Sequence, residues 1–341
     1  EQAHCMVPPT VNPAYDYEYF KTISKLDEEN ERTLKSTIDV YRKLGAILTF
    51  DCTPFFENNV PRFGEICSFS ASGGAVYVNS VLGARTNREA AQSAMCAAIT
   101  GVTPEYGLLL EQNRAGDVLI QVEADVDSEY DYELLGYITP KKMGQAYHCP
   151  VFNGLSKQTT SEQLMDLGTQ LNIHGIVPMF HVVGVTPEAA DVHTAFLGRK
   201  DPPVVTITNE DLAQARAEIS AGTGKADFCI LGCPHLTINQ VGSIAKMLDG
   251  QQLAGQLYIF TSTSTKELAQ RMGYLDIIHK AGGEIVINSC VDQPCWSHLY
   301  GMSGVTESPK CAYYTKRWNM TFTVKSIPAC IQSVLKGEIV S

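Results

Sequence analysis

Strand-like and helix-like segments alternate through almost the whole 341-residue chain, and this alternation is the feature that most limits its fold. Two parallel strands need a long crossover connection, which is usually a helix, so such alternation is typical of largely parallel sheets covered by helices. We therefore predict an α/β fold. The apolar runs predicted as strands are residues 46–50, 75–81, 176–180, 227–231, 257–261 and 284–289.

Three segments outside these runs carry helix signals. Residues 28–43 follow Asp27, a good N-cap, and precede Gly45, which suits the end of a helix. Residues 89–100 are rich in small side chains and predict a closely packed helix, and a third helix is predicted near 266–272. The buried stripe of the first helix is predicted to be Leu34, Ile38, Tyr41 and Leu44.

The length of the chain is about twice that of a usual single domain. A composition of 44% hydrophobic and 18% charged residues is that of a globular protein with a large buried core. Residues 146–161 show the weakest alternation and predict a connection between two halves. We therefore expect an N-terminal half over 1–150 and a C-terminal half over 151–341.

Charge and cysteine usage exclude several classes of protein. The net charge of −11 disfavours binding to nucleic acid or to a membrane surface, and no apolar run approaches the roughly 20 residues of a membrane span. Eleven cysteines, an odd number without a secretory signal, predict reduced thiols in a cytoplasmic protein rather than a disulfide framework. The common signatures of nucleotide binding, zinc proteases and α/β-hydrolases are absent.

Reactive side chains follow several of the predicted strands, where parallel sheets place their chemistry. Cys52 follows 46–50, and Cys290 ends 284–289. Together with Cys311 they are three thiols from distant loops, which could hold an iron–sulfur cluster and leave one iron open. Cys295 is an alternative to Cys290.

The loop GARTNRE, residues 83–89, is the clearest candidate for anion binding. Arg85 and Arg88 flank Asn87 just before a predicted helix, and two guanidinium groups suit a carboxylate or phosphate. Arg62 and Arg114 are weaker candidates of the same kind. The alternative is that an arginine pairs with a nearby glutamate and only braces the loop.

Seven segments, in this order along the chain, resemble the large subunit of the aconitase X family. The block YVNSVLGARTNRE is long and specific, and the resemblance extends from about residue 8 to residue 314. The segments are PPTVNPAYD (8–16), LTFDCTPFFENNVPRFGE (48–65), YVNSVLGARTNRE (77–89), GVTPEYGLLLEQNR (101–114), FHVVGVTPEA (180–189), LGCPH (231–235) and SPKCAYY (308–314).

This resemblance implies aconitase-like α/β/α layers and a hydro-lyase that removes water from a small 3-hydroxy acid. It implies an iron–sulfur cluster of the 4Fe-4S, 3Fe-4S or 2Fe-2S type, with Cys52, Cys290 and Cys311 as metal ligands. The family includes phosphomevalonate dehydratases, which we expect first, and cis-3-hydroxy-L-proline dehydratases as the alternative. The residues expected to contact substrate are Arg62, Arg85, Asn87, Arg88, His235, Ser308 and Lys310.

The family's base is a serine on a swivelling small domain that we do not find in this sequence. We expect that domain on a separate small subunit or on missing chain.

Two other hypotheses about the function stay open. One is a non-catalytic cluster-binding protein that reports iron status by binding RNA. The net negative charge of the chain disfavours this hypothesis. The other is a cluster-free relative that holds mononuclear iron or no metal among its cysteines.

Overall fold

The computed structural model describes residues 3–144, 146–220 and 222–340. The chain packs into two compact units, each built from two stretches of sequence. The first unit comprises Glu1–Pro9 and Pro54–Glu218, and the second comprises Thr10–Thr53 and Ile219–Ser341. The predicted division at residue 150 stays a prediction, and that point of the chain lies at the start of a strand of the first unit.

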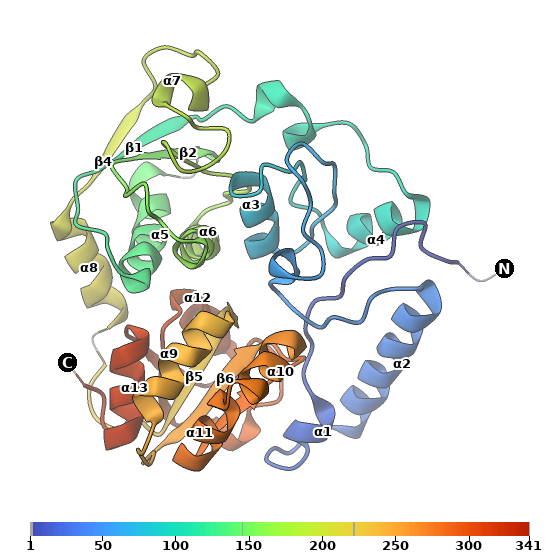
Figure 1. Ribbon diagram of the computed structural model, residues 1–341, viewed down its shortest axis with the longest axis vertical. Helices are drawn as coiled ribbons and strands as arrows, with labels where there is room; N and C mark the ends of the chain where they lie inside the picture. The colour runs from blue at the N-terminus through green and yellow to red at the C-terminus, as the bar shows by residue number, and fades with distance from the viewer. Residues whose placement is uncertain (1–2, 145, 221, 341) are drawn as a thin grey trace. The chain divides into compact units, whose positions relative to one another are not determined.

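The first unit contains a parallel sheet in the order β3-β2-β1-β4, of which Figure 1 labels β2, β1 and β4. Helices α5 and α6 pack so closely that a Cβ on Gly136 of α5 would lie 2.6 Å from the Leu167 carbonyl oxygen of α6. The elements are η1 (Pro54–Phe56), α3 (Ser72–Ser80), α4 (Ala91–Thr100), η2 (Gly107–Leu109), η3 (Glu111–Asn113), β1 (Val118–Val122), α5 (Glu129–Met143), β2 (Pro150–Asn153), α6 (Ser161–His174), β3 (His181–Val182), α7 (Val192–Ala195), β4 (Val204–Ile207) and α8 (Asn209–Ile219).

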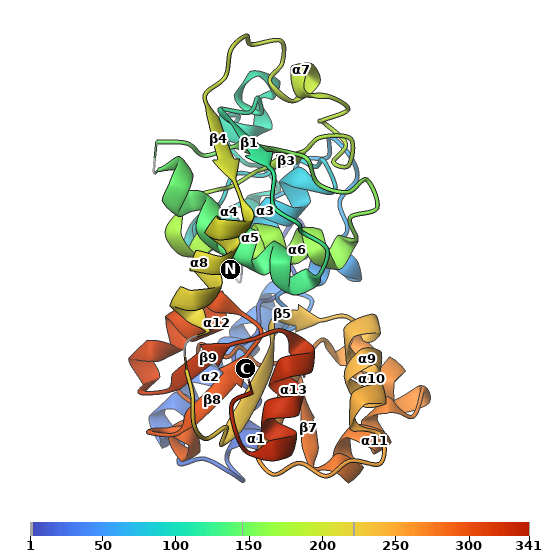
Figure 2. The ribbon, with the colours of Figure 1, turned by 90° about the vertical axis from the view of Figure 1, so that its left-hand side faces the viewer.

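The second unit contains a parallel sheet in the order β7-β6-β5-β8-β9, and Figure 2 shows α13 beside β5 and β8. Every pairing between named strands of the described residues is parallel, which confirms the predicted α/β class. The elements are α1 (Tyr17–Phe20), α2 (Glu28–Leu44), β5 (Phe228–Leu236), α9 (Ile238–Leu248), β6 (Gln256–Thr261), α10 (Thr263–Arg271), α11 (Tyr274–Ala281), β7 (Gly283–Val286), η4 (Ser297–Leu299), β8 (Ser303–Thr306), α12 (Pro309–Tyr314), η5 (Thr315–Trp318), β9 (Thr321–Val324) and α13 (Ile327–Lys336).

Both faces of the second sheet are buried. Successive side chains of a strand point to opposite faces, so neighbouring residues of one strand pack on different sides of the sheet. On β6, Leu257 and Ile259 pack in a cluster with residues of α9, α11 and α13. Tyr258 and Phe260 face the other way, where they contact the fully buried indole of Trp296. This two-sided burial explains why the strands of this unit appear as continuous apolar runs in the sequence.

The predicted helices form where their capping signals stand. Asp27 accepts a hydrogen bond from the Glu29 amide at the start of α2, and Gly45 ends that helix at φ +81°. The expected stripe of α2 is only half-buried. Helix α10 begins after its N-cap Ser262 and α4 ends at Gly101, as expected. Within the described residues, no helix combines the length and apolar character needed to cross a bilayer.

Three predicted strands are wrong. Residues 75–81 lie mostly in helix α3, where residues 74–80 are all buried, and a helix buried on every side shows no periodicity that separates it from a strand. Residues 46–50 form only a single bridge, from Ile47 to Thr10, and none of them is fully buried. Residues 176–180 form no strand, because β3 begins only at His181.

Candidate metal centre and anion-binding loop

The strand order of the second sheet reverses between β5 and β8, and the candidate metal centre lies at this point. Open α/β sheets bind ligands beyond the carboxyl ends of their strands where the order reverses. The segment LGCPH lies inside β5, whose ladder with β6 is irregular between Leu231 and Leu236. Gly232 has φ +109°, and a Cβ there would lie 2.3 Å from the Phe260 carbonyl oxygen.

Four cysteine thiols of the second unit interact with one another. Burial raises the pKa of each, and the charge of Cys290 further raises the pKa of Cys52, Cys233 and Cys311. Cys52, Cys233 and Cys290 are half-buried, whereas Cys311 is fully buried in an apolar cluster. The alternative ligand Cys295 is also fully buried in that cluster.

Cys233 is the thiol that the sequence analysis missed. Its pKa is raised by burial to about 12, and its thiol bonds to the Ser308 hydroxyl. Ser308 is itself buried and caps α12 by accepting the Cys311 amide at 3.3 Å. The half-buried Lys310 lowers the pKa of both Cys233 and Cys290. The signal in the sequence was the cysteine of LGCPH, which stands two residues before His235.

His235 is 2% exposed and has both ring nitrogens bonded. Nδ1 lies 2.9 Å from Asp51 Oδ1, and Nε2 lies 2.9 Å from the Ser289 carbonyl oxygen. Its backbone amide donates to Cys52 Sγ at 3.3 Å. His235, expected to contact substrate, thus has its polar atoms engaged within the protein.

Asp51 is a buried carboxylate next to Cys52. Burial raises its pKa, but hydrogen bonds from His235 and Thr53 outweigh that effect, so the net pKa is lowered and the group is ionised at neutral pH. Donor atoms of Asp51, Cys52 and His235 lie within 4.8 Å of one another. Among the described residues, Asp51 Oδ2 finds no hydrogen-bond partner although it is buried.

Glu307 is a second buried carboxylate that the sequence analysis missed. Its Oε1 accepts hydrogen bonds from the Gly232 amide at 2.6 Å and from the Cys233 amide at 3.2 Å. Burial raises its pKa. Glu307 therefore fixes the backbone turn that presents Cys233.

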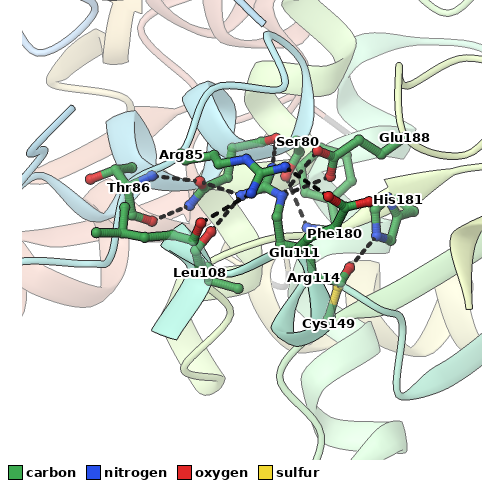
Figure 3. Close-up of polar contacts among 12 residues, drawn as sticks. Ser80, Arg85, Thr86, Leu108, Glu111, Arg114, Cys149, Phe180, His181 and Glu188 are labelled. Atoms are coloured by element: carbon green, nitrogen blue, oxygen red, sulfur yellow. Dashed lines mark hydrogen bonds and ion pairs between the residues drawn. The ribbon is translucent and has the colours of Figure 1, made fainter. Parts of the chain in front are cut away.

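The GARTNRE loop belongs to the first unit (Figure 3). Arg85 donates to the Leu109 carbonyl at 3.0 Å and lies 3.6 Å from the exposed Glu111 carboxylate. Arg88 is exposed and donates to Asn172 Oδ1 at 2.9 Å. Asn87 is buried and uses both ends of its amide on the backbone of Tyr106 and Leu108, which makes it a brace of the loop.

Arg114 is a structural residue rather than a candidate for anion binding. It is 2% exposed, and its Nε donates to both oxygens of Glu188, at 2.9 and 3.0 Å (Figure 3). Its other nitrogens donate to Asn79 and to the Leu108 carbonyl. Asn79 in turn bonds the backbone of Thr86, so this network holds the loop that carries Arg85.

Arg62 and His181 of the first unit differ in exposure. Arg62 is exposed, and its backbone amide donates to the Glu65 carboxylate at 2.8 Å. His181 is 1% exposed, and its Nε2 bonds the Arg114 carbonyl at 2.8 Å (Figure 3). Within the described part of the chain its Nδ1 has no partner, and burial lowers its pKa.

The donor set of the second unit fits an iron–sulfur cluster. Thiolates are the ligands that such clusters take, and they also suit zinc or copper. Backbone amides already point at two of the sulfurs, from His235 to Cys52 and from Asp292 to Cys290 at 3.4 Å. Burial raises the pKa of Cys290, and the Asp292 amide and the charge of Lys310 offset part of that effect, toward the thiolate form that a metal requires.

Two parallel α/β units, one of which gathers thiols where its strand order reverses, define an α/β protein with a candidate metal centre. The chain belongs to the aconitase X family. Its sequence matches the first domain of aconitase X over residues 1–112, the second domain over 116–217 and the third domain over 226–336.

Relatives from archaea and bacteria extend this match. The phosphomevalonate dehydratase large subunits of Thermococcus kodakarensis and Methanothermobacter thermautotrophicus are 34% and 36% identical, over 90% of this chain and 78% and 75% of theirs. The cis-3-hydroxy-L-proline dehydratase of Pseudomonas aeruginosa is 34% identical over 74% of this chain and 45% of its own. The crystal structure of Thermococcus kodakaraensis aconitase X in its holo-form matches with a TM-score of 0.85, at 31% identity over 98% of this chain and 82% of its own. These relatives are all dehydratases or aconitase X.

Proposed function

We propose that this chain is the large subunit of a dehydratase that removes water from a small 3-hydroxy acid at an iron–sulfur cluster. The observation that carries the proposal is that His235 bonds the segments of Cys52 and Cys290 and stands two residues after Cys233, where the strand order of the second sheet reverses. A purely structural role would not require two carboxyl groups to be buried beside these cysteines, Asp51 next to Cys52 and Glu307 on the Cys233 amide.

Three of the four thiols are needed to hold a cluster and leave one iron open. Exposure favours Cys52, Cys233 and Cys290, which are half-buried, because an open iron has to be reached by substrate. Cys311, named by the sequence analysis, is 0% exposed and surrounded by apolar side chains, so it is the alternative third ligand. Its backbone amide, held by Ser308, supports the shape of the site instead.

The cluster, when bound, supplies a Lewis-acidic iron that makes the substrate hydroxyl a better leaving group. The residues of this chain would do the rest of the binding. Arg85 and Arg88 of the first unit would bind the carboxylate or phosphate, since guanidinium groups form strong charge-assisted bonds to both. Lys310 would offset the negative charge of the thiolates. The base that removes the proton is expected on a small subunit.

The substrate we propose is 5-phosphomevalonate, with cis-3-hydroxy-L-proline as the alternative. Two relatives named phosphomevalonate dehydratase large subunit align with 90% of this chain, and the relative named for hydroxyproline aligns with 74%. The name of the first group also supports a small-subunit partner for this chain.

Turnover tests this proposal. Anaerobically purified protein, with and without a co-expressed small subunit, is mixed with each of the two hydroxy acids, and product formation is followed. We expect dehydration of 5-phosphomevalonate only when the small subunit is present. Dehydration of neither compound by a cluster-loaded complex would contradict the proposal.

A further inference from the structure

His235 joins the three cysteine-bearing segments of the candidate metal centre. Its own strand, β5, carries Cys233 two residues earlier. Its ring bonds Asp51, which precedes Cys52, and the carbonyl of Ser289, which precedes Cys290. Its backbone amide also donates directly to Cys52 Sγ. One buried residue thus bonds Cys52 and the residues that precede Cys52 and Cys290, and stands two residues after Cys233 on the same strand.

The ring is poorly suited to contact substrate. Only 2% of His235 is exposed, and both nitrogens face oxygen acceptors at 2.9 Å. A substrate contact would break one of these bonds and leave a buried acceptor unsatisfied, at a cost of about 1–3 kcal/mol. For the same reason His235 is a poor metal ligand, although its ring lies near Asp51 and Cys52.

The partners of His235 are themselves held in place. Asp51 Oδ1 also accepts bonds from the Thr53 amide and hydroxyl, at 2.9 and 3.0 Å. The hydroxyl of Ser289 accepts the Asp16 amide at 2.8 Å. The ring therefore connects two segments that each carry further hydrogen bonds, and its removal would delete that connection.

We propose that His235 is a positioning residue that sets the spacing of Cys52, Cys233 and Cys290 before a cluster binds. The inference rests on the proposed function, because it assumes that these thiols hold a metal cluster. Outer partners that orient metal ligands typically account for about 10- to 100-fold in metal affinity. His235 would act through both ring bonds, so a variant that keeps one of them should keep part of the effect.

Three variants test this inference. H235F removes both ring bonds, H235N places an amide near Nδ1 and keeps the Asp51 bond, and H235Q places one near Nε2 and keeps the Ser289 bond. All three retain the backbone bond to Cys52. The readouts are iron and sulfide per chain after anaerobic reconstitution, the rate of iron loss to a chelator, and the electron paramagnetic resonance spectrum. We expect iron loss to accelerate about 10- to 100-fold in H235F and less in the other two variants.

His298 of the same unit provides the matched control. Both of its ring nitrogens are also bonded, to the Ser24 and Tyr258 hydroxyls at 3.0 and 3.1 Å. H298F should lose two bonds yet keep the iron content, the spectrum and the rate of iron loss of the unaltered protein. Thermal unfolding of each cluster-free variant reports its folding separately.

Two outcomes would overturn the inference while leaving the proposed function intact. One is an H235F protein that holds iron with the stoichiometry, spectrum and loss rate of the unaltered chain. The other is an H298F protein that loses iron as fast as H235F, which would indicate a general loss of stability. Failure of the unaltered protein to take up any iron–sulfur cluster would instead contradict the proposed function.

Discussion

Replacing Arg114 with methionine tests whether a buried ion pair holds the GARTNRE loop. The change leaves Glu188 and two carbonyl oxygens without their donor. Breaking a buried pair by removing one partner costs about 3–5 kcal/mol. The Glu188 side chain is 18% exposed and so can be partly hydrated, which places the expected cost near the lower end, about 3 kcal/mol. In a unit of this size that corresponds to a fall of about 6–12 °C in Tm.

Calorimetry of the R114M variant measures this loss as a shift of the transition of the first unit. The control is R216M, which breaks an exposed ion pair with Asp131 at 3.4 Å and should cost no more than about 1 kcal/mol. The double variant R114M/E188Q should recover part of the loss, because it removes the uncompensated charge. An R114M protein whose Tm lies within 2 °C of the R216M value, about what one small surface effect produces, would show that the Arg114–Glu188 pair does not stabilise the first unit.

Two further predictions concern the first unit. Burial lowers the pKa of His181, so the unfolded chain binds a proton at about pH 6.5 while the folded chain does not. His181 therefore contributes stability above that pH and loses it as the pH falls toward the folded-state pKa; the urea midpoint should fall between about pH 7 and pH 5, and it should fall less in H181Q. Equal slopes for the two proteins would contradict this assignment. Replacing the exposed Arg88 with alanine should raise the KM for the hydroxy acid about 10- to 100-fold, the value of one charge-assisted hydrogen bond, and an unchanged KM in steady-state kinetics would remove Arg88 from the substrate site.

Local signals predicted part of the fold correctly. The helix that starts after Asp27 combines an N-cap with a terminal glycine, and both act through neighbouring backbone atoms. Residues 75–81 were misassigned because burial on all sides leaves no polar face to mark the period. Residues 46–50 were misassigned because an apolar run forms a strand only when a neighbouring strand is available to pair with it.

The candidate site shows the same limit. The rule that parallel sheets place their chemistry beyond strand ends singled out Cys290, which follows β7. It also singled out Cys52, although the run before Cys52 forms no strand. Both Cys233 and Cys311 stand near the carboxyl ends of strands, so sequence position does not decide which is the third ligand. Their exposure differs, since Cys233 is half-buried and Cys311 is buried. In the same way, only burial separates Arg114, which is paired within the protein, from an exposed arginine that can bind a ligand.

The proposal that Cys52, Cys233 and Cys290 hold an iron–sulfur cluster can be tested on single serine variants. The measurement is iron and acid-labile sulfide per chain after anaerobic reconstitution. We expect C52S, C233S and C290S each to lose the cluster and its visible absorption, and C311S to retain both. Retention in C233S with loss in C311S would return the third ligand to Cys311. An unaltered protein that binds neither iron nor sulfide would contradict the account.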